Sequence, residues 1–228
     1  IMRSLAISLY RRADLLGPLA KDGRALENIS SWLQQRPAPQ NHFSQAWIDV
    51  CLGIVYWSEA RNEQALPLLN RGSLLETQFD HSLTPWALLV AGRIAIDAGD
   101  FERATKVLEQ ATFAAAVQED ARALEEAFRW AANAHLALDG RLPQSVASAI
   151  KWSEKQLPSL SLRLLANATA VLAEQGDIQQ AARSAFKLNQ LLENSQLALG
   201  RCGAYFKYAG ALIAVSYTHL TLPTSVIV

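Results

Sequence analysis

The sequence has few cysteines, no excess of charge of either sign and no long apolar run, and each absence narrows the class of protein. Neither Cys51 nor Cys202 has a second Cys or a His near it at metal-ligand spacing, so we expect buried free thiols, without a disulfide framework or a zinc site. Twenty-one basic residues balance twenty-one acidic ones, which removes the electrostatic footprint of a protein that mainly binds nucleic acid or an anionic membrane. No apolar stretch approaches the roughly 18 residues of a membrane-spanning helix. We therefore expect no nucleic-acid partner and no membrane insertion.

Residue sets with catalytic or cofactor chemistry are also missing. The four histidines are scattered along the chain, and no HExxH, GxSxG, glycine-rich phosphate loop or Asp-x-Asp calcium loop occurs. The carboxylate run at 119–126 is most simply the start of a helix and its solvated face, where acidic residues are favourable. We expect no enzymatic activity, no metal and no cofactor.

Helical periodicity dominates what is present. Half of the residues are apolar, and they recur at helical spacing in runs of three to five turns, while proline and glycine fall between the runs. Alternation typical of strands is nearly absent before residue 215. The pattern predicts an all-α chain of about eleven helices joined by short turns, with neighbouring helices antiparallel.

Internal repeats give these helices an order. The clearest unit, at 88–111, reads LLVAGRIAIDAGDFERATKVLEQA and has small or aromatic residues at the positions Gly92, Gly99, Phe101, Ala104 and Ala111. The unit before it reads LGIVYWSEA from Leu52 and repeats the register. These motifs resemble the tetratricopeptide repeat. The resemblance implies a right-handed superhelical solenoid of antiparallel helical hairpins.

The repeat is longer than the family norm. The residues at the eighth position of each unit are Ala13, Gly53, Gly92, Asn133, Thr169 and Gly203, so the steps are 40, 39, 41, 36 and 34, against a family period of roughly 34. A different solenoid of helical hairpins is the alternative. We expect repeats at about 6–45, 46–84, 85–125, 126–161 and 162–195, with a half repeat at 196–214.

Small residues predict how each hairpin is packed. Gly53 facing Ala65, and Gly92 facing Ala104, would let two backbones approach while leucines fill the space beside them. Gly99 is predicted to end a helix in the left-handed conformation, with the aspartate after it capping the next helix. The Gly-Asp pair at 176–177 predicts the same turn.

The last fourteen residues differ in character. The segment VSYTHLTLPT at 215–224 is β-branched, rich in hydroxyl groups and without helical period. It resembles a translated adapter of transposase-based sequencing libraries, and a natural tail is the alternative. We expect 215–228 to be non-native, so that the array 1–214 is truncated at its C-terminal end. The chain also begins within a helical pattern, as a fragment would. The compartment therefore stays open, although scarce cysteine and a soluble character fit the cytoplasm.

Six tryptophans are the residues most suggestive of binding. In the tetratricopeptide family the ligand groove is lined by fixed positions of the first helix of each hairpin. Mapped onto this chain, that resemblance implies a concave, tryptophan-rich groove with Trp47, Ile54, Trp57, Trp86, Leu89, Arg93, Trp130 and Arg163 as candidate partner-binding residues. The competing interpretation is that the tryptophans simply fill the core between long helices.

These observations favour a protein-interaction scaffold that binds a peptide or a partner domain through the groove, since large aromatic anchors dominate interface energy. The alternative is a regulatory or sensor arm of a larger enzyme or transcriptional regulator. The oligomeric state is left open by the sequence.

Overall fold

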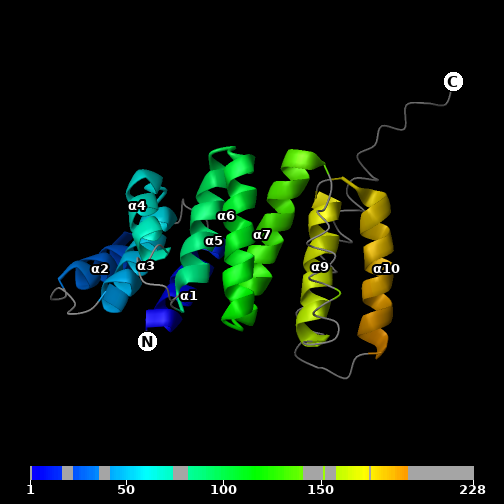
Figure 1. Ribbon diagram of the computed structural model, residues 1–228, viewed down its shortest axis with the longest axis horizontal. Coiled ribbons are helices and arrows are strands. Elements are labelled where there is room, and N and C mark those ends of the chain that lie inside the picture. Colours follow the sequence, from blue (N-terminus) through cyan, green and yellow to red (C-terminus); the bar gives the residue numbers. More distant parts are fainter. Residues whose placement is uncertain are drawn as a thin grey trace. The chain divides into compact units, whose positions relative to one another are not determined.

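The computed structural model describes residues 2–16, 23–35, 42–73, 82–140, 151, 158–174 and 176–194. The chain divides into two compact units, unit 1 at residues 1–134 and unit 2 at residues 135–228. In the described ranges every regular element is an α-helix (Figure 1), which confirms the all-α expectation.

Nine helices lie in the described part of the chain, rather than about eleven. Unit 1 holds α1 (Met2–Leu16), α2 (Gly23–Gln34), α3 (His42–Ser58), α4 (Asn62–Ser73), α5 (Thr84–Asp97), α6 (Phe101–Val117) and most of α7 (Ala121–Asp139). Unit 2 holds the end of α7, α9 (Pro158–Glu174) and α10 (Ile178–Asn194). The predicted half repeat at 196–214, the tail at 215–228 and Cys202 lie outside the described residues.

From α2 to α6, consecutive helices of unit 1 pack antiparallel to one another (Figure 1). The helices α3 and α4 form one hairpin, α5 and α6 form the next, and α4 also contacts α5. In addition, α3 contacts α1 and α5, the helices two places before and after it. The core of unit 1 therefore lies between sequential hairpins, and it includes the fully buried Leu69, Leu89 and Leu108.

Two glycines set the spacing within the hairpins. A Cβ atom built on Gly53 would lie 2.7 Å from the Cγ atom of Leu69, and one built on Gly92 would lie 2.5 Å from that of Leu108. Ala65, the residue predicted to face Gly53, is also buried, and its carbonyl oxygen lies 3.4 Å from the same built Cβ. The predicted close approach of the backbones is therefore confirmed at Gly53, and leucine is the nearest contact of both glycines.

Four turns between helices share one hydrogen-bond pattern, in which a left-handed residue ends the first helix. After α5, the N–H of Gly99 bonds to the carbonyl of Ile96, and the N–H of Asp100 bonds to that of Ala95, both at 2.9 Å. The same pair of bonds closes the turns after α3, α6 and α9. The left-handed residues are Ala60 (φ 60°), Gly99 (φ 75°), Glu119 (φ 53°) and Gly176 (φ 80°). This pairing is the Schellman motif, and it satisfies carbonyls left open at the helix end.

Aspartates that follow these turns cap the next helix, as predicted at two of them. Asp100 accepts the N–H of Arg103 at 3.1 Å, and Asp177 accepts that of Gln180 at 3.1 Å. The sequence did not reveal that Ala60 adopts the conformation of glycine in an equivalent turn. The pattern of hydrogen bonds, rather than the residue type, thus defines the turn.

The left-handed position is glycine in the turn after α5 and alanine in the turn after α3, so opposite substitutions can be made at equivalent positions. Gly99→Ala is expected to lower the free energy of unfolding by about 1 kcal/mol, because an L side chain is strained at positive φ. Ala60→Gly relieves that strain and is expected to raise it by about 0.5 kcal/mol, after the entropy cost of glycine. Urea unfolding followed by circular dichroism measures both. Equal signs for the two changes would contradict this account of the turns.

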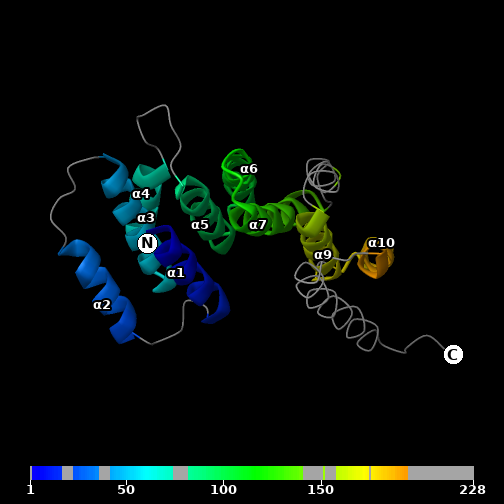
Figure 2. The ribbon, with the colours of Figure 1, turned by 90° about the horizontal axis from the view of Figure 1, so that it is seen from below.

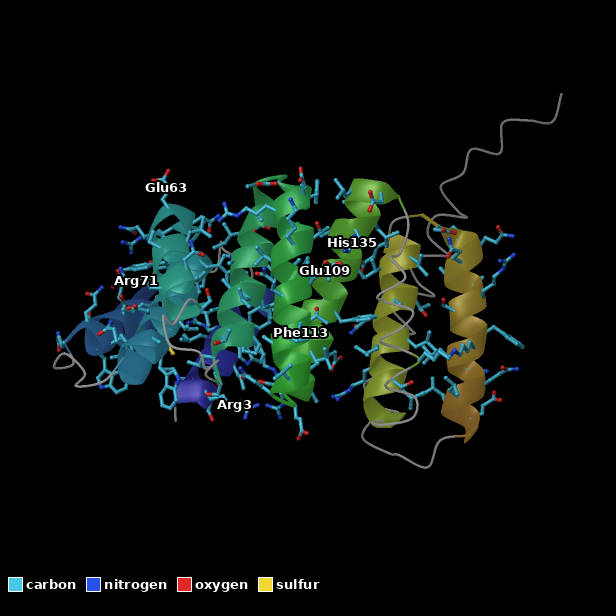
Figure 3. The ribbon with its side chains drawn as sticks, in the orientation of Figure 1. Arg3, Glu63, Arg71, Glu109, Phe113 and His135 are labelled. Atoms are coloured by element: carbon cyan, nitrogen blue, oxygen red, sulfur yellow. The ribbon has the colours of Figure 1, made fainter. Side chains whose placement is uncertain are left out.

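An ion pair between a buried aspartate and an exposed arginine joins α3 to α4. Asp49 is 3% exposed and accepts from Nε of Arg71 at 3.0 Å and from Nη2 at 3.3 Å. Gln45, one turn earlier on α3, donates to the same carboxylate at 2.9 Å. The hydrogen bond and the charge of Asp49 raise the pKa of Arg71. Figure 3 shows Arg71 on α4. The pair holds the open end of the α3–α4 hairpin.

Unit 2 is built on the hairpin of α9 and α10. Val171, Leu172 and Ala173 of α9 pack with Ala181 of α10 and Leu136 of α7 in one apolar cluster. Phe186 on α10 is 67% exposed and lies away from that cluster. No helix among the described residues is long and apolar enough to cross a membrane.

Candidate binding face

The first helix of unit 1 lies against several others. Figure 2 shows α1 beside α3 and α5, on the side that faces away from α4 and α6. Ala6, Leu9, Tyr10 and Ala13 of α1 are buried. Their spacing of three and four residues is one face of an α-helix. An amphipathic helix therefore covers the side of the hairpins that α3 and α5 present.

Tyr10 is the centre of this contact and is 1% exposed. Its ring stacks on Trp57 with centroids 5.7 Å apart, and it meets Trp86 edge to face at 5.3 Å. Both separations are within the range at which aromatic pairs attract. The phenol hydroxyl donates to Glu126 and accepts from Arg93, each at 3.4 Å. One side chain of α1 thus contacts α3, α5 and α7.

Arg93 lies among three aromatic rings. Its guanidinium carbon is 3.9 Å from the ring centroid of Trp130, 4.8 Å from that of Trp57 and 5.8 Å from that of Tyr10. A cation within about 6 Å of a ring centroid is attracted by the π system. Arg93 therefore ties α5 to α7, α3 and α1 at one point.

Asp120 connects the same helices through charge. This residue is 3% exposed, and its Oδ2 atom accepts from the indole N–H of Trp86 at 3.0 Å and from Arg3 at 2.9 Å. Its Oδ1 atom caps α7 by accepting the backbone N–H groups of Arg122 and Ala123, each at 3.2 Å. Arg3 is about half exposed and lies near the start of α1 (Figure 3). A single carboxylate therefore accepts hydrogen bonds from an indole on α5 and from the backbone of the first turn of α7, and forms an ion pair with α1.

We call the residues that contact α1, together with Trp130, which contacts Arg93, the aromatic face. It consists of Trp57 on α3, Trp86 and Arg93 on α5, Glu126 and Trp130 on α7, and Asp120 at the cap of α7. All of them belong to unit 1. Four were predicted as groove residues, whereas Asp120 and Glu126 were interpreted as the start of a helix and its solvated face. Asp120 does cap the start of α7, but the sequence did not indicate its contact with Arg3 or the contact of Glu126 with Tyr10, because those partners are remote in the chain.

The predicted groove residues differ in exposure. The structure buries Ile54, Trp57, Trp86 and Leu89, each 6% exposed or less, and leaves the other four partly buried. Seven of the eight lie on α3, α5 and the unit 1 part of α7, whereas Arg163 lies on α9 in unit 2. Four of them are brought together around Tyr10 and its neighbour Arg93: Trp57, Trp86, Arg93 itself and Trp130.

Two tryptophans of unit 1, one of them in the aromatic face, have unsatisfied donors. The buried indole N–H groups of Trp47 and Trp130 have no hydrogen-bond acceptor in the described part of the chain. Buried polar groups are paired in the great majority of cases, and each exception needs an explanation.

Outside the aromatic face, the described residues include a thiol and potential metal ligands. Cys51 is fully buried, and burial raises the pKa of its thiol to about 12, so the reactive thiolate does not form near neutral pH. No group of three or more potential metal ligands comes together in the described ranges.

A separate depression of about 540 Å³ lies where α4, α5 and α6 meet, and Lys106, Glu109 and the 72% exposed Phe113 line part of it. Figure 3 shows Glu109 and Phe113 one turn apart along α6. The depression contains none of the residues of the aromatic face.

Comparison of the chain with protein-family models, curated proteins and solved structures gives no match.

Proposed function

We propose that the chain is a protein-interaction scaffold of tetratricopeptide-like hairpins, which binds a helical segment of a partner protein on the aromatic face. The observation that carries the proposal is that this face already receives a helix, α1, through a buried tyrosine. A surface that holds one amphipathic helix has the shape and chemistry to hold another.

The stacking of the hairpins supports the architectural part of the proposal. First helices of successive hairpins contact one another, as α3 does with α5, and this is the arrangement that produces a solenoid with an extended binding surface. The small residues at Gly53 and Gly92 lie at hairpin contacts, as the resemblance implies.

The chemistry of the face supports the binding part. Tryptophan and arginine are the residue types that most often dominate interface energy, and the face combines Trp57, Trp86 and Trp130 with Arg93. The carboxylates of Asp120 and Glu126 add acceptors for a basic or hydroxyl-bearing side chain. A partner helix with an aromatic anchor and a cation fits this set.

Selection of helical peptides against the full chain tests the proposal. A displayed library of 16-residue amphipathic helices is panned on the immobilised protein, and Kd of the selected peptides is measured by fluorescence anisotropy. We expect Kd values of about 1–100 μM, since α1 competes for the face. Arg93→Leu should weaken binding about tenfold, because an aromatic anchor of the partner loses the cation and the hydrogen-bond donor that Tyr10 of α1 contacts.

Phe113→Ala is the matched control, because Phe113 is highly exposed on α6 and outside the aromatic face. It should leave Kd unchanged. Peptides that tolerate Arg93→Leu but lose binding with Phe113→Ala would place the site elsewhere. A library that gives no binder would overturn the proposal.

A further inference from the structure

In a regular solenoid each repeat contacts only its neighbours, and α1 departs from that rule. Tyr10 contacts Arg93 and Trp86 on α5 and Glu126 on α7, up to 116 positions away in the sequence. Arg3 reaches Asp120 at the cap of α7. The first helix therefore packs on α3 and also reaches α5 and α7 through the side chains of Tyr10 and Arg3, as a bound ligand would.

We propose that α1 is a built-in occupant of the aromatic face, and that the partner is an amphipathic helix with an arginine seven residues before a tyrosine. This inference rests on the proposed function. It adds that α1 competes with the partner for the face, and it names the side chains that the partner helix needs in order to displace α1.

The spacing of the two anchors follows from helix geometry. Arg3 and Tyr10 are seven residues apart, which is close to two turns and about 10 Å along one helix face. The arginine meets the carboxylate of Asp120, and the tyrosine enters the space between Trp57 and Trp86. Buried small or apolar residues at Ala6, Leu9 and Ala13 lie on the same side of α1. A partner helix that reproduces these positions makes the same contacts.

The polar contacts of α1 are suited to exchange. The two hydrogen bonds of the Tyr10 hydroxyl are long, at 3.4 Å each, and Arg3 is half exposed. Asp120 retains Trp86 and two backbone N–H groups as donors when Arg3 leaves. The contacts of α3 with α4 and of α5 with α6 do not involve α1. Release of α1 thus leaves the hairpins of the face intact.

Peptide binding to the full chain tests the inference. The probe is a fluorescein-labelled synthetic peptide with the sequence of residues 1–16, and the readout is anisotropy. In the double variant Arg3→Ala/Tyr10→Ala, the tethered helix is weakened while the face is unchanged. We expect the peptide to bind this variant about tenfold more tightly than the unmodified chain, because the fraction of open face increases. The single variant Arg3→Ala should give a smaller gain of about threefold.

Matched controls come from the exposed side of α1. Ser8→Ala/Arg11→Ala changes two exposed residues of the same helix and should leave the affinity for the peptide unchanged. Peptides with Arg3→Ala or Tyr10→Ala should lose most of their binding to the double variant. Circular dichroism verifies that each protein retains its helical content.

Two results would overturn the inference. One is a double variant that binds the peptide no more tightly than the unmodified chain. The other is a double variant that unfolds, since a displaceable helix can be weakened without loss of the fold. If library-selected helices bind the face while the 1–16 peptide does not, only this inference fails. If no helix binds, the proposed function fails as well.

Discussion

Replacing Trp86 with alanine is expected to lower the free energy of unfolding of unit 1 by about 3–5 kcal/mol, the usual cost of truncating a buried large aromatic residue. Trp86 is 1% exposed, packs edge to face on Tyr10, and donates its indole N–H to Asp120. Truncation removes all of these contacts and leaves a cavity between α5, α1 and the start of α7. Urea unfolding monitored by tryptophan fluorescence and circular dichroism measures the loss.

Two variants separate the contributions to this effect. Trp86→Phe keeps an aromatic ring but leaves Asp120 without its indole donor, so a smaller loss of about 1–3 kcal/mol is expected. Trp32→Ala truncates a tryptophan that is 42% exposed and should change the stability by about 0.5 kcal/mol or less. A Trp86→Ala protein as stable as the Trp32→Ala protein would show that the aromatic cluster contributes little to the fold. The outcome also separates the two interpretations of the tryptophans, because a large loss makes Trp86 a core residue first.

Periodicity and turn chemistry made the local structure predictable. The sequence located the breaks before and after α5, because Gly99 supplies a left-handed residue and Asp100 an N-cap. It also identified Gly53 and Gly92 as close-approach points. These features depend on residues near one another in the chain, so the sequence pattern alone predicts them. The helix count was too high, at about eleven against nine in the described ranges.

Long-range contacts were not predictable in the same way. The position of α1 depends on Tyr10 and Arg3 meeting residues more than eighty positions away, and no periodic signal links such pairs. The register of the repeats placed α1 as an ordinary first helix. It implied that Trp57 and Trp86 line a groove, whereas their burial agrees with the competing interpretation that the tryptophans fill the core; neither interpretation indicated that α1 contacts them. Likewise, Asp120 was expected at the start of a helix, where it caps α7, but on a solvated face, although it is 3% exposed.

Asp120→Ala is expected to lower the free energy of unfolding of unit 1 by about 2–4 kcal/mol, because α7 loses its N-cap and a buried donor is left unsatisfied. The carboxylate caps α7 through two backbone N–H groups and accepts from the buried indole of Trp86. Its alanine variant leaves that indole N–H without an acceptor and also removes the ion pair with Arg3. Chemical unfolding of the full chain measures the effect.

Arg3→Ala is the matched control, because it removes only the ion pair and leaves Asp120 to cap α7 and to accept from Trp86. We expect a cost of about 1 kcal/mol or less, as for other partly exposed ion pairs. If the Arg3→Ala variant is as unstable as the Asp120→Ala variant, the charge pairing with α1 outweighs the cap and the indole bond. In that case α1 would be a fixed part of unit 1, and the stability of this one variant would argue against its displacement by a partner helix.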